Sequence, residues 1–269
     1  MVETKPRIIA IVQARMASSR LPGKVLLDLA GEPMLARVVE RARRAKTVDE
    51  VVVATTADPE DDAVAQFCER RGYPCYRGSQ FDVLDRYYQA AKQAGADVVV
   101  RITADCLLMD PSLIDKTVLA LFRLQPGNTL AAGAQPAFDF AANRLPPPWG
   151  RTYPIGLDVE VCTFAALERA WKEAEQPYQR EHVMPYLYEE EGRFRVALVN
   201  HEKDYGSLRW TVDTPEDLHL LHEIYSRLPD SESFTWLDVL EVWQQEPELA
   251  EINASVQHKK MSDVDERRA

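Results

Sequence analysis

The sequence predicts an α/β fold built on a doubly wound, mostly parallel β-sheet. Three short runs, at 8–12, 51–54 and 98–102, are rich in Val and Ile and have the composition of strands buried on both faces. Segments with the apolar spacing of amphipathic helices separate these runs. This alternation predicts parallel strands, with ligands bound at their carboxyl ends.

Local signals support each helix of the first half. The helix after the first strand begins beside Pro33, which a first helical turn tolerates, and basic residues crowd its C-terminal end. The next helix ends at Gly72, and a later one begins at Pro111. The expected helices lie at 34–42, 60–71, 82–94 and 111–124, with a loop at 76–80.

The second half is less regular. Between Pro136 and Tyr153, three consecutive prolines precede Trp149, and we expect this stretch to leave the core. Further on we expect strands at 157–161, 194–199 and 208–212, and helices at 164–174, 180–188, 215 onward and 236–245. We expect one domain over 1–254 with an excursion at about 136–188, and a charged, disordered tail at 255–269.

Composition excludes several classes of protein. The 269 residues include 43 acidic and 32 basic side chains, a net charge of −11, so we expect no nucleic-acid partner. No apolar run reaches the roughly 18 residues that cross a membrane, and the N-terminal residues do not form an apolar signal core. The four cysteines lack Cys-x-x-Cys spacing. We therefore expect a cytoplasmic protein with reduced thiols and no membrane partner.

The loop at 13–24 is the most informative stretch. It places Arg15, Arg20 and Lys24 at a strand–helix junction, where backbone N–H groups favour anions. Arginine forms paired hydrogen bonds with phosphate and lysine adds a mobile charge, so the three suit a triphosphate. The loop has neither the P-loop nor the Rossmann glycine pattern. A solvated basic loop is the alternative.

The same loop carries a family resemblance. Ile9-Ala10-Ile11-Val12-Gln13-Ala14-Arg15, followed by Ser19-Arg20-Leu21-Pro22-Gly23-Lys24, closely resembles the signature of the cytidylyltransferases that activate sugar acids, such as the CMP-Kdo and CMP-sialic acid synthetases. Later motifs, in order over about 8–225, are most similar to the SpsF-type branch of spore-coat polysaccharide biosynthesis. They are Gly31-Glu32-Pro33-Met34, Arg77-Gly78-Ser79, Asp82-Val83-Leu84-Asp85-Arg86, Thr103-Ala104-Asp105-Cys106, Gly156-Leu157-Asp158-Val159-Glu160, Arg180-Glu181-His182 and Val212-Asp213-Thr214-Pro215-Glu216-Asp217.

The resemblance implies the fold of the nucleotide-sugar (GT-A-like) transferases and a specific reaction. CMP from CTP would be joined to a sugar acid or a related phosphorylated acceptor, with Mg²⁺ as cofactor and pyrophosphate as product, in surface-polysaccharide biosynthesis. It implies catalytic roles for Arg15, Lys24 and Asp105, and Mg²⁺ ligation by Asp105 and Asp213. The implied nucleotide-binding residues are Ala14, Arg15, Ser19, Arg20, Lys24, Arg77, Gly78 and Ser79.

Several of these residues have structural alternatives. Asp105 has the alternative of a turn or a helix cap before Pro111, and Asp213 or Thr214 would also cap a helix, in a box with Glu216. The 77–79 loop has the alternative of a plain turn. The residues Asp158, Glu160, Arg180 and His182 would bind the acceptor sugar, contact a second subunit, or simply face solvent.

Two departures shape the functional hypothesis. The CMP-Kdo enzymes have Gly-Asp-Glu-Pro where this chain has Ala104-Asp105-Cys106-Leu107, which argues against Kdo as the acceptor. A glycosyltransferase of the same fold is one alternative function, but Thr103 replaces the first acid of its Asp-x-Asp motif. A nucleotide-binding module without turnover is the other. The resemblance also implies a homodimer, and the stiff apolar segment at 146–149 would need a covering surface.

Overall fold

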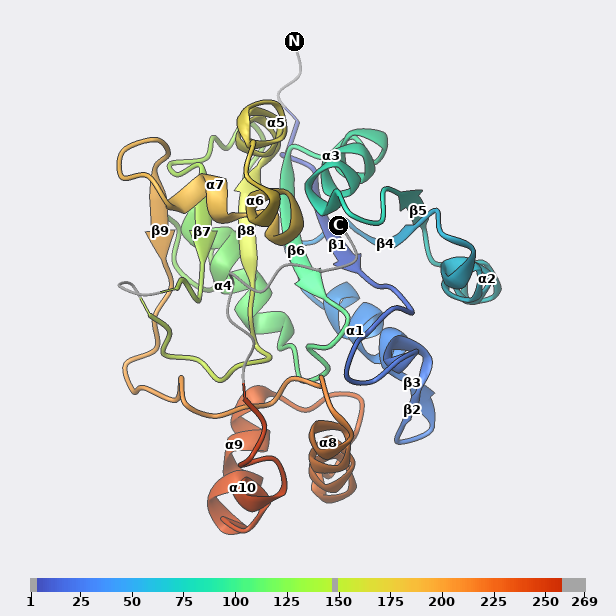
Figure 1. Cartoon of the computed structure of the whole chain (residues 1–269). Helices are drawn as coiled ribbons and strands as arrows, with labels where there is room; N and C mark the ends of the chain where they lie inside the picture. Colours follow the sequence, from blue (N-terminus) through green and yellow to red (C-terminus); the bar gives the residue numbers. More distant parts are fainter. Residues whose placement is uncertain (1–3, 147–149, 258–269) are drawn as a thin grey trace.

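The computed structural model describes residues 4–146 and 150–257. At its centre is a seven-stranded sheet in the order β5-β4-β1-β6-β8-β7-β9 (Figure 1). The strands are β1 (Ile8–Gln13), β4 (Glu50–Thr56), β5 (Cys75–Gly78), β6 (Val98–Thr103), β7 (Phe140–Ala142), β8 (Glu160–Thr163) and β9 (Val196–Leu198). β8 runs antiparallel to both its neighbours, and the other neighbouring pairs are parallel. The predicted α/β class with a mostly parallel sheet is confirmed.

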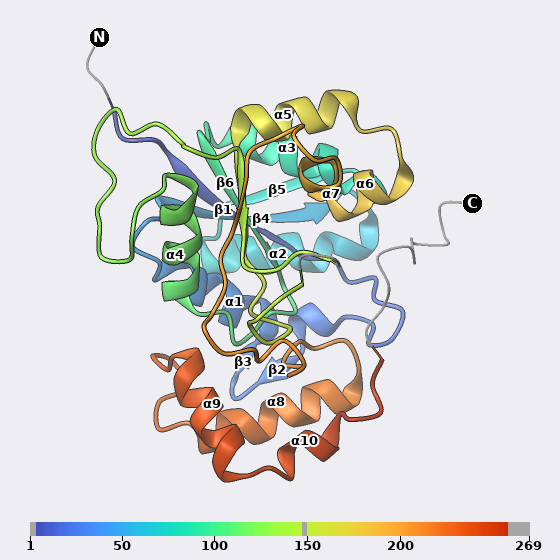
Figure 2. The same ribbon diagram turned by 90° about the vertical axis from the view of Figure 1, so that its left-hand side faces the viewer.

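Helices cover both faces of the sheet. Figure 2 shows α3 and α5 on one side, α1 and α4 on the other, and α8 to α10 as a further layer beyond α1. The helices are α1 (Met34–Arg43), α2 (Asp62–Arg71), α3 (Val83–Gln93), α4 (Pro111–Leu121), α5 (Phe164–Glu173), α6 (Pro177–His182), α7 (Pro185–Tyr188), α8 (Pro215–Arg227), α9 (Trp236–Gln245) and α10 (Leu249–Ile252). None of the described helices is long and apolar enough to cross a membrane.

β1 is the central strand and is completely buried from Ile8 to Val12. Its side chains alternate between two hydrophobic cores, Ile8, Ala10 and Val12 facing one and Ile9 and Ile11 the other. This double burial explains the continuous apolar run. At its carboxyl end, Gln13 lies beside Ala54 of β4 and Thr103 of β6, so three parallel strands end at one edge.

Two short strands of the seven-stranded sheet differ from expectation, and the small two-stranded sheet of β2 (Asp28–Leu29) and β3 (Glu32–Pro33) was not predicted. Cys75–Gly78 forms β5 beside β4, where we expected a loop from residue 76. Phe140–Ala142 forms β7, inside the range expected to leave the core, and all three residues are fully buried between β8 and β9. The expectation of an excursion is therefore wrong for these residues, because a small apolar strand completes the sheet there. Residues 147–149, including Trp149, and 258–269 of the expected tail lie outside the described residues.

Two other elements differ from expectation. The helix expected at 180–188 is two helices, α6 and α7, because Val183 has φ +71° and interrupts the helical backbone. The strand expected at 208–212 is extended chain with only an isolated bridge from Arg209 to Ile155. The N–H of Trp210 donates to the oxygen of Ile155, whereas that of Val212 donates to the oxygen of Asp105. Its backbone hydrogen bonds are thus shared between two segments.

Candidate active site

The loop at 14–24 is fixed over the carboxyl end of β1. The N–H of Gly23 donates to the oxygen of Met16 at 2.8 Å, and Gly23 has φ +70°, a conformation that glycine adopts readily. The N–H of Met16 in turn donates to Asp61 Oδ1 at 2.6 Å. A 3₁₀ turn, Lys24–Leu26, follows and leaves only 8% of Lys24 exposed. These contacts of the loop therefore fix the position of Lys24.

Lys24 lies between two aspartates. Its Nζ is 3.0 Å from Asp105 Oδ2, 3.0 Å from Asp213 Oδ1 and 2.6 Å from the oxygen of Val212. Burial alone would lower the pKa of Lys24, but the charges of the two carboxylates outweigh it and raise that pKa. Burial would raise the pKa of Asp213, but Lys24, Arg209 and Arg20 hold it well below its usual range. Lys24 and Asp213 are both charged at neutral pH.

Neither aspartate caps a helix. The N-cap of α4 is Asp110, and the N-cap of α8 is Thr214, whose partner in the capping box is Asp217 rather than Glu216. Asp105 instead lies in the turn after β6. Its backbone oxygen accepts a hydrogen bond from the N–H of Val212 at 3.1 Å. The backbone thus holds Asp105 and Asp213 close together, and neither carboxylate is used to cap a helix.

A pocket of about 210 Å³ opens beside this cluster. It brings together seven of the predicted residues, which are Ala14, Arg15, Ser19, Arg20, Lys24, Asp105 and Asp213. The rest of its lining was not predicted and consists of Gln13, Ala17, Ser18, Val25, Arg86, Thr103 and Ala104. Lysine and arginine dominate one wall, which suits a polyanion.

Arg86 lines the first pocket, although it was not among the predicted nucleotide-binding residues. It is 1% exposed, and burial is the chief reason that its pKa falls to about 10. Its Nη1 donates to the oxygen of Ser79 at 2.9 Å. Within the described part of the chain, Arg86 Nε and Gln13 Oε1 have no hydrogen-bond partner. Both side chains line the first pocket, and Arg86 belongs to the motif at 82–86 that carries the family resemblance.

A second pocket, of about 140 Å³, lies on the other side of the aspartates. Thr103, Asp105 and Asp213 line both pockets and so form the wall between them. The second pocket is also lined by Arg101, Cys106, Arg144, Ile155, Asp158 and Thr211. Of the predicted acceptor residues, only Asp158 lines it directly.

Arginine side chains form ion pairs with Asp158 and Glu160 at the second pocket. Arg151 donates to both oxygens of Asp158, at 2.9 and 3.3 Å, and Arg144 Nε is 3.7 Å from the same carboxylate. Glu160 is buried and bonds to Arg101, so it reaches the pocket only through that arginine. Among the described residues, the Nε atoms of Arg101 and Arg144 have no hydrogen-bond partner.

The other predicted residues line neither pocket. Arg77 turns away, donating to the backbone oxygens of Thr56 and Asp58 at 3.0 Å each. Gly78 and Ser79 pass behind Arg86, and the loop at 77–79 touches the first pocket only through that side chain.

The acceptor residues expected on α6 are also elsewhere. Arg180 binds Asp82 through Nε and Nη2, at 3.0 and 2.5 Å, and donates to the oxygen of Trp171 at 2.6 Å. It thereby ties α6 to α3. His182 is likewise absent from the linings of both pockets. The structure thus brings the first-loop residues together with Asp105 and Asp213, and leaves the α6 residues apart.

Comparison with known proteins gives one consistent result. A family model described as cytidylyltransferase matches residues 9–228. The chain is 37% identical to the uncharacterized protein MJ1063 of Methanocaldococcus jannaschii, over 97% of this chain and all of that one. It is 29% identical to the spore coat polysaccharide biosynthesis protein SpsF of Bacillus subtilis, over 90% of this chain and 96% of SpsF. The solved structure of a cytidylyltransferase from Leptospira borgpetersenii matches with a TM-score of 0.81 and 31% identity, over 95% of this chain and 100% of that one.

Proposed function

This chain belongs to the cytidylyltransferase family, and we propose that it transfers CMP from CTP to a sugar acid or a related phosphorylated acceptor, with Mg²⁺ as cofactor. One observation carries the proposal. Thr103, Asp105 and Asp213 form a wall shared by two pockets, one cationic and one lined by Arg101, Arg144 and Asp158. Two pockets that meet at a pair of carboxylates suit a reaction between two bound substrates.

The chemistry fits this arrangement. With CTP in the first pocket and the acceptor in the second, the α-phosphorus would lie at the shared wall. An acceptor oxygen forms a bond to that phosphorus while the bond to the β-phosphate oxygen breaks, pyrophosphate leaves with the electron pair, and the hydroxyl proton goes to solvent. Arg15, Arg20 and Lys24 would neutralise the triphosphate, whose charge otherwise opposes attack.

The residues present fit Mg²⁺. Asp105 and Asp213 each place an oxygen 3.0 Å from one ammonium group, which supports their sharing a single cation. Mg²⁺ in phosphate sites is typically held by one or two carboxylates together with phosphate oxygens and water. When bound, it would offset the charge that develops on the phosphate oxygens. No cluster of three His, Cys, Asp or Glu side chains in residues 4–146 and 150–257 is arranged to hold a metal.

The second pocket supports an acidic acceptor. The Nε atoms of Arg101 and Arg144, which have no hydrogen-bond partner among the described residues, would donate to a carboxylate or phosphate, the anions that guanidinium groups bind best. Asp158 would accept from a sugar hydroxyl, since Arg151 already orients it. The name of SpsF supports a role in surface-polysaccharide biosynthesis, and we propose that the protein acts in the cytoplasm.

A substrate screen tests the reaction. Purified protein with CTP, UTP, GTP or ATP and a panel of sugar acids and sugar phosphates is assayed for pyrophosphate. We expect release only with CTP, an acidic acceptor and Mg²⁺. Pyrophosphate release that does not require an acceptor would overturn the proposal. Transfer of the sugar from a nucleotide sugar would also overturn it and would favour a glycosyltransferase.

We also propose a homodimer that uses the region 136–188. This region supplies β7, β8 and α5 to α7, and β9, next to β7, is an open edge of the sheet. Light scattering at micromolar concentration is expected to give twice the mass of one chain. A monomer with full activity on dilution contradicts the dimer and favours a segment that covers its own domain.

A further inference from the structure

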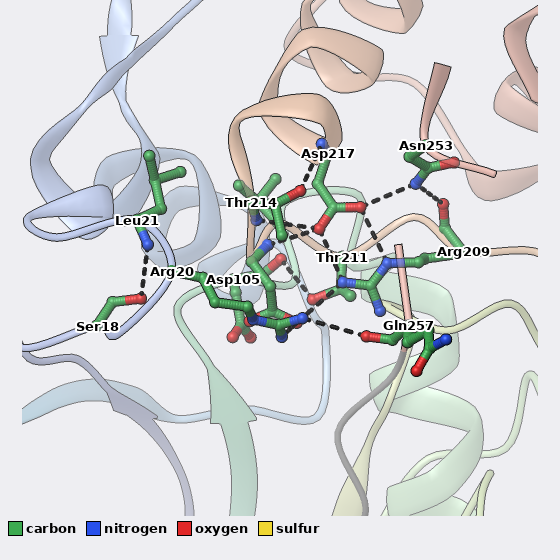
Figure 3. Close-up of polar contacts among 12 residues, drawn as sticks. Ser18, Arg20, Leu21, Asp105, Arg209, Thr211, Thr214, Asp217, Asn253 and Gln257 are labelled. Atoms are coloured by element: carbon green, nitrogen blue, oxygen red, sulfur yellow. Dashed lines mark hydrogen bonds and ion pairs between the residues drawn. The ribbon is translucent and has the colours of Figure 1, made fainter. Parts of the chain in front are cut away.

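A buried carboxylate stands directly behind Asp213. Asp217, in the first turn of α8, is 0% exposed and lines neither pocket. Its oxygens accept from Arg209 Nε at 2.9 Å and Nη2 at 2.7 Å (Figure 3). They also accept from the N–H of Asp213 at 2.9 Å. Asp217 is therefore a buried carboxylate whose two oxygens both accept hydrogen bonds from the surrounding protein.

Arg209 connects Asp217 to the side chain of Asp213. Its Nη2, which bonds to Asp217, also lies 3.0 Å from Asp213 Oδ2. The backbone of Asp213 is thus held by Asp217 and its carboxylate by Arg209. The other oxygen, Oδ1, remains on Lys24. Arg20 Nη2 also lies 2.9 Å from Asp213 Oδ2. The Asp213 carboxylate is therefore held from the first pocket by Lys24 and Arg20, and from behind by Arg209 and Asp217, which line neither pocket.

The C-terminal part of the chain completes this pair. Asn253, just after α10, is 5% exposed, and its Nδ2 donates to Asp217 Oδ1 at 2.9 Å and to the oxygen of Arg209 at 3.3 Å. Further on, the backbone oxygen of Gln257 accepts from Arg20 Nη1 at 3.1 Å (Figure 3). Both residues lie beyond the part of the chain that the family model matches, which ends at residue 228.

We propose that Asn253 is a positioning residue for the transfer reaction, acting through Asp217 and Arg209 on the carboxylate of Asp213. The inference rests on the proposed metal-binding role of Asp213. Hydrogen bonds behind a ligating group fix its orientation, and their loss typically costs 10–100-fold in metal affinity. The amide of Asn253 supplies such a bond indirectly, through Asp217 and Arg209.

Metal binding without turnover tests this. Mn²⁺ is titrated into the full-length protein with saturating CTP and no acceptor, and free Mn²⁺ is followed by electron paramagnetic resonance. Asn253→Ala is expected to raise the Mn²⁺ Kd about tenfold and to lower kcat, with little change in the KM for CTP. The control is Leu249→Ala, which removes a buried side chain from the same short helix and keeps the amide. It is expected to lower Tm and leave the Mn²⁺ Kd unchanged.

A second variant separates this inference from the proposed function. Asp213→Asn removes the charge of the proposed ligand and is expected to weaken Mn²⁺ binding more than Asn253→Ala does. If Asp213→Asn binds Mn²⁺ like the unmodified protein, the metal role of Asp213 is wrong. If Asp213→Asn weakens binding but Asn253→Ala does not, or if Leu249→Ala weakens it equally, only the positioning role of Asn253 is overturned.

Discussion

Asp105→Asn is expected to lower kcat about 1,000-fold while the protein stays folded, since charge stabilisation by a bound metal is worth several kcal/mol and each 1.36 kcal/mol is tenfold in rate. Asn keeps the size of the side chain and removes the charge that faces both pockets. Lys24 retains its contacts with Asp213 and with the oxygen of Val212. Steady-state pyrophosphate release and thermal unfolding measure the two effects.

Asp110→Asn is the matched control. Asp110 lies five residues after Asp105 and is 2% exposed. Its two carboxylate oxygens accept hydrogen bonds from the N–H groups of Ser112 at 2.7 Å and Trp236 at 2.8 Å. Asn can accept only one of these bonds, so this variant is expected to lose more stability than Asp105→Asn and to keep its kcat below the unfolding temperature. An Asp105→Asn protein with more than about a tenth of normal kcat would contradict the metal role.

The elements of the fold that were predicted correctly are those whose own residues have a recognisable pattern. The five buried residues of β1 need apolar side chains on both faces, so the run itself reveals a central strand. β7 is a three-residue strand, Phe-Ala-Ala, with no β-branched residue and no room for alternation. Its strand character comes from the pairing with β8 and β9, which the local sequence does not encode.

The candidate site also has a part that the local sequence predicts and a part that depends on the packed fold. The residues from Ala14 to Lys24 are one continuous loop, and their convergence on one pocket follows from a motif. The pairs Arg209–Asp217 and Arg101–Glu160 join segments whose proximity depends on the packed sheet and α8. Arg77 shows the opposite case. The resemblance implied a nucleotide contact for its motif, but its guanidinium donates to two nearby backbone oxygens and lines neither pocket.

Lys24→Met is expected to have the second large effect, a fall of about 100- to 1,000-fold in kcat/KM for CTP, the range seen when one preorganised donor is removed from a site. Methionine keeps the apolar stem in the loop but leaves Asp105 and Asp213 without the cation between them. Lys116→Met is the control, because Lys116 is partly buried and donates to the hydroxyl of Tyr153 at 2.9 Å, outside both pockets. It is expected to keep normal kcat/KM.

The stability effect of Lys24→Met should depend on pH. The lowered pKa of Asp213 contributes stability that is present above the unfolded value of about 3.9 and is lost as the pH falls through the folded value. The raised pKa of Lys24 contributes stability that is present below about 10.4 and is lost as the pH rises through the folded value. Both contributions are therefore complete between about pH 5 and pH 9.

Urea unfolding at pH 7 and pH 3 measures this dependence. At pH 7 we expect Lys24→Met to lower the free energy of unfolding by about 2 kcal/mol, less than the 3–5 kcal/mol of a fully buried pair, because the aspartates keep 25% and 22% of their side chains exposed. At pH 3 the difference should shrink, since protonation of Asp213 in the unfolded chain has begun to remove the contribution of the ion pair. An equal loss of stability at both pH values would mean that Lys24 acts through its packed stem and not through its charge.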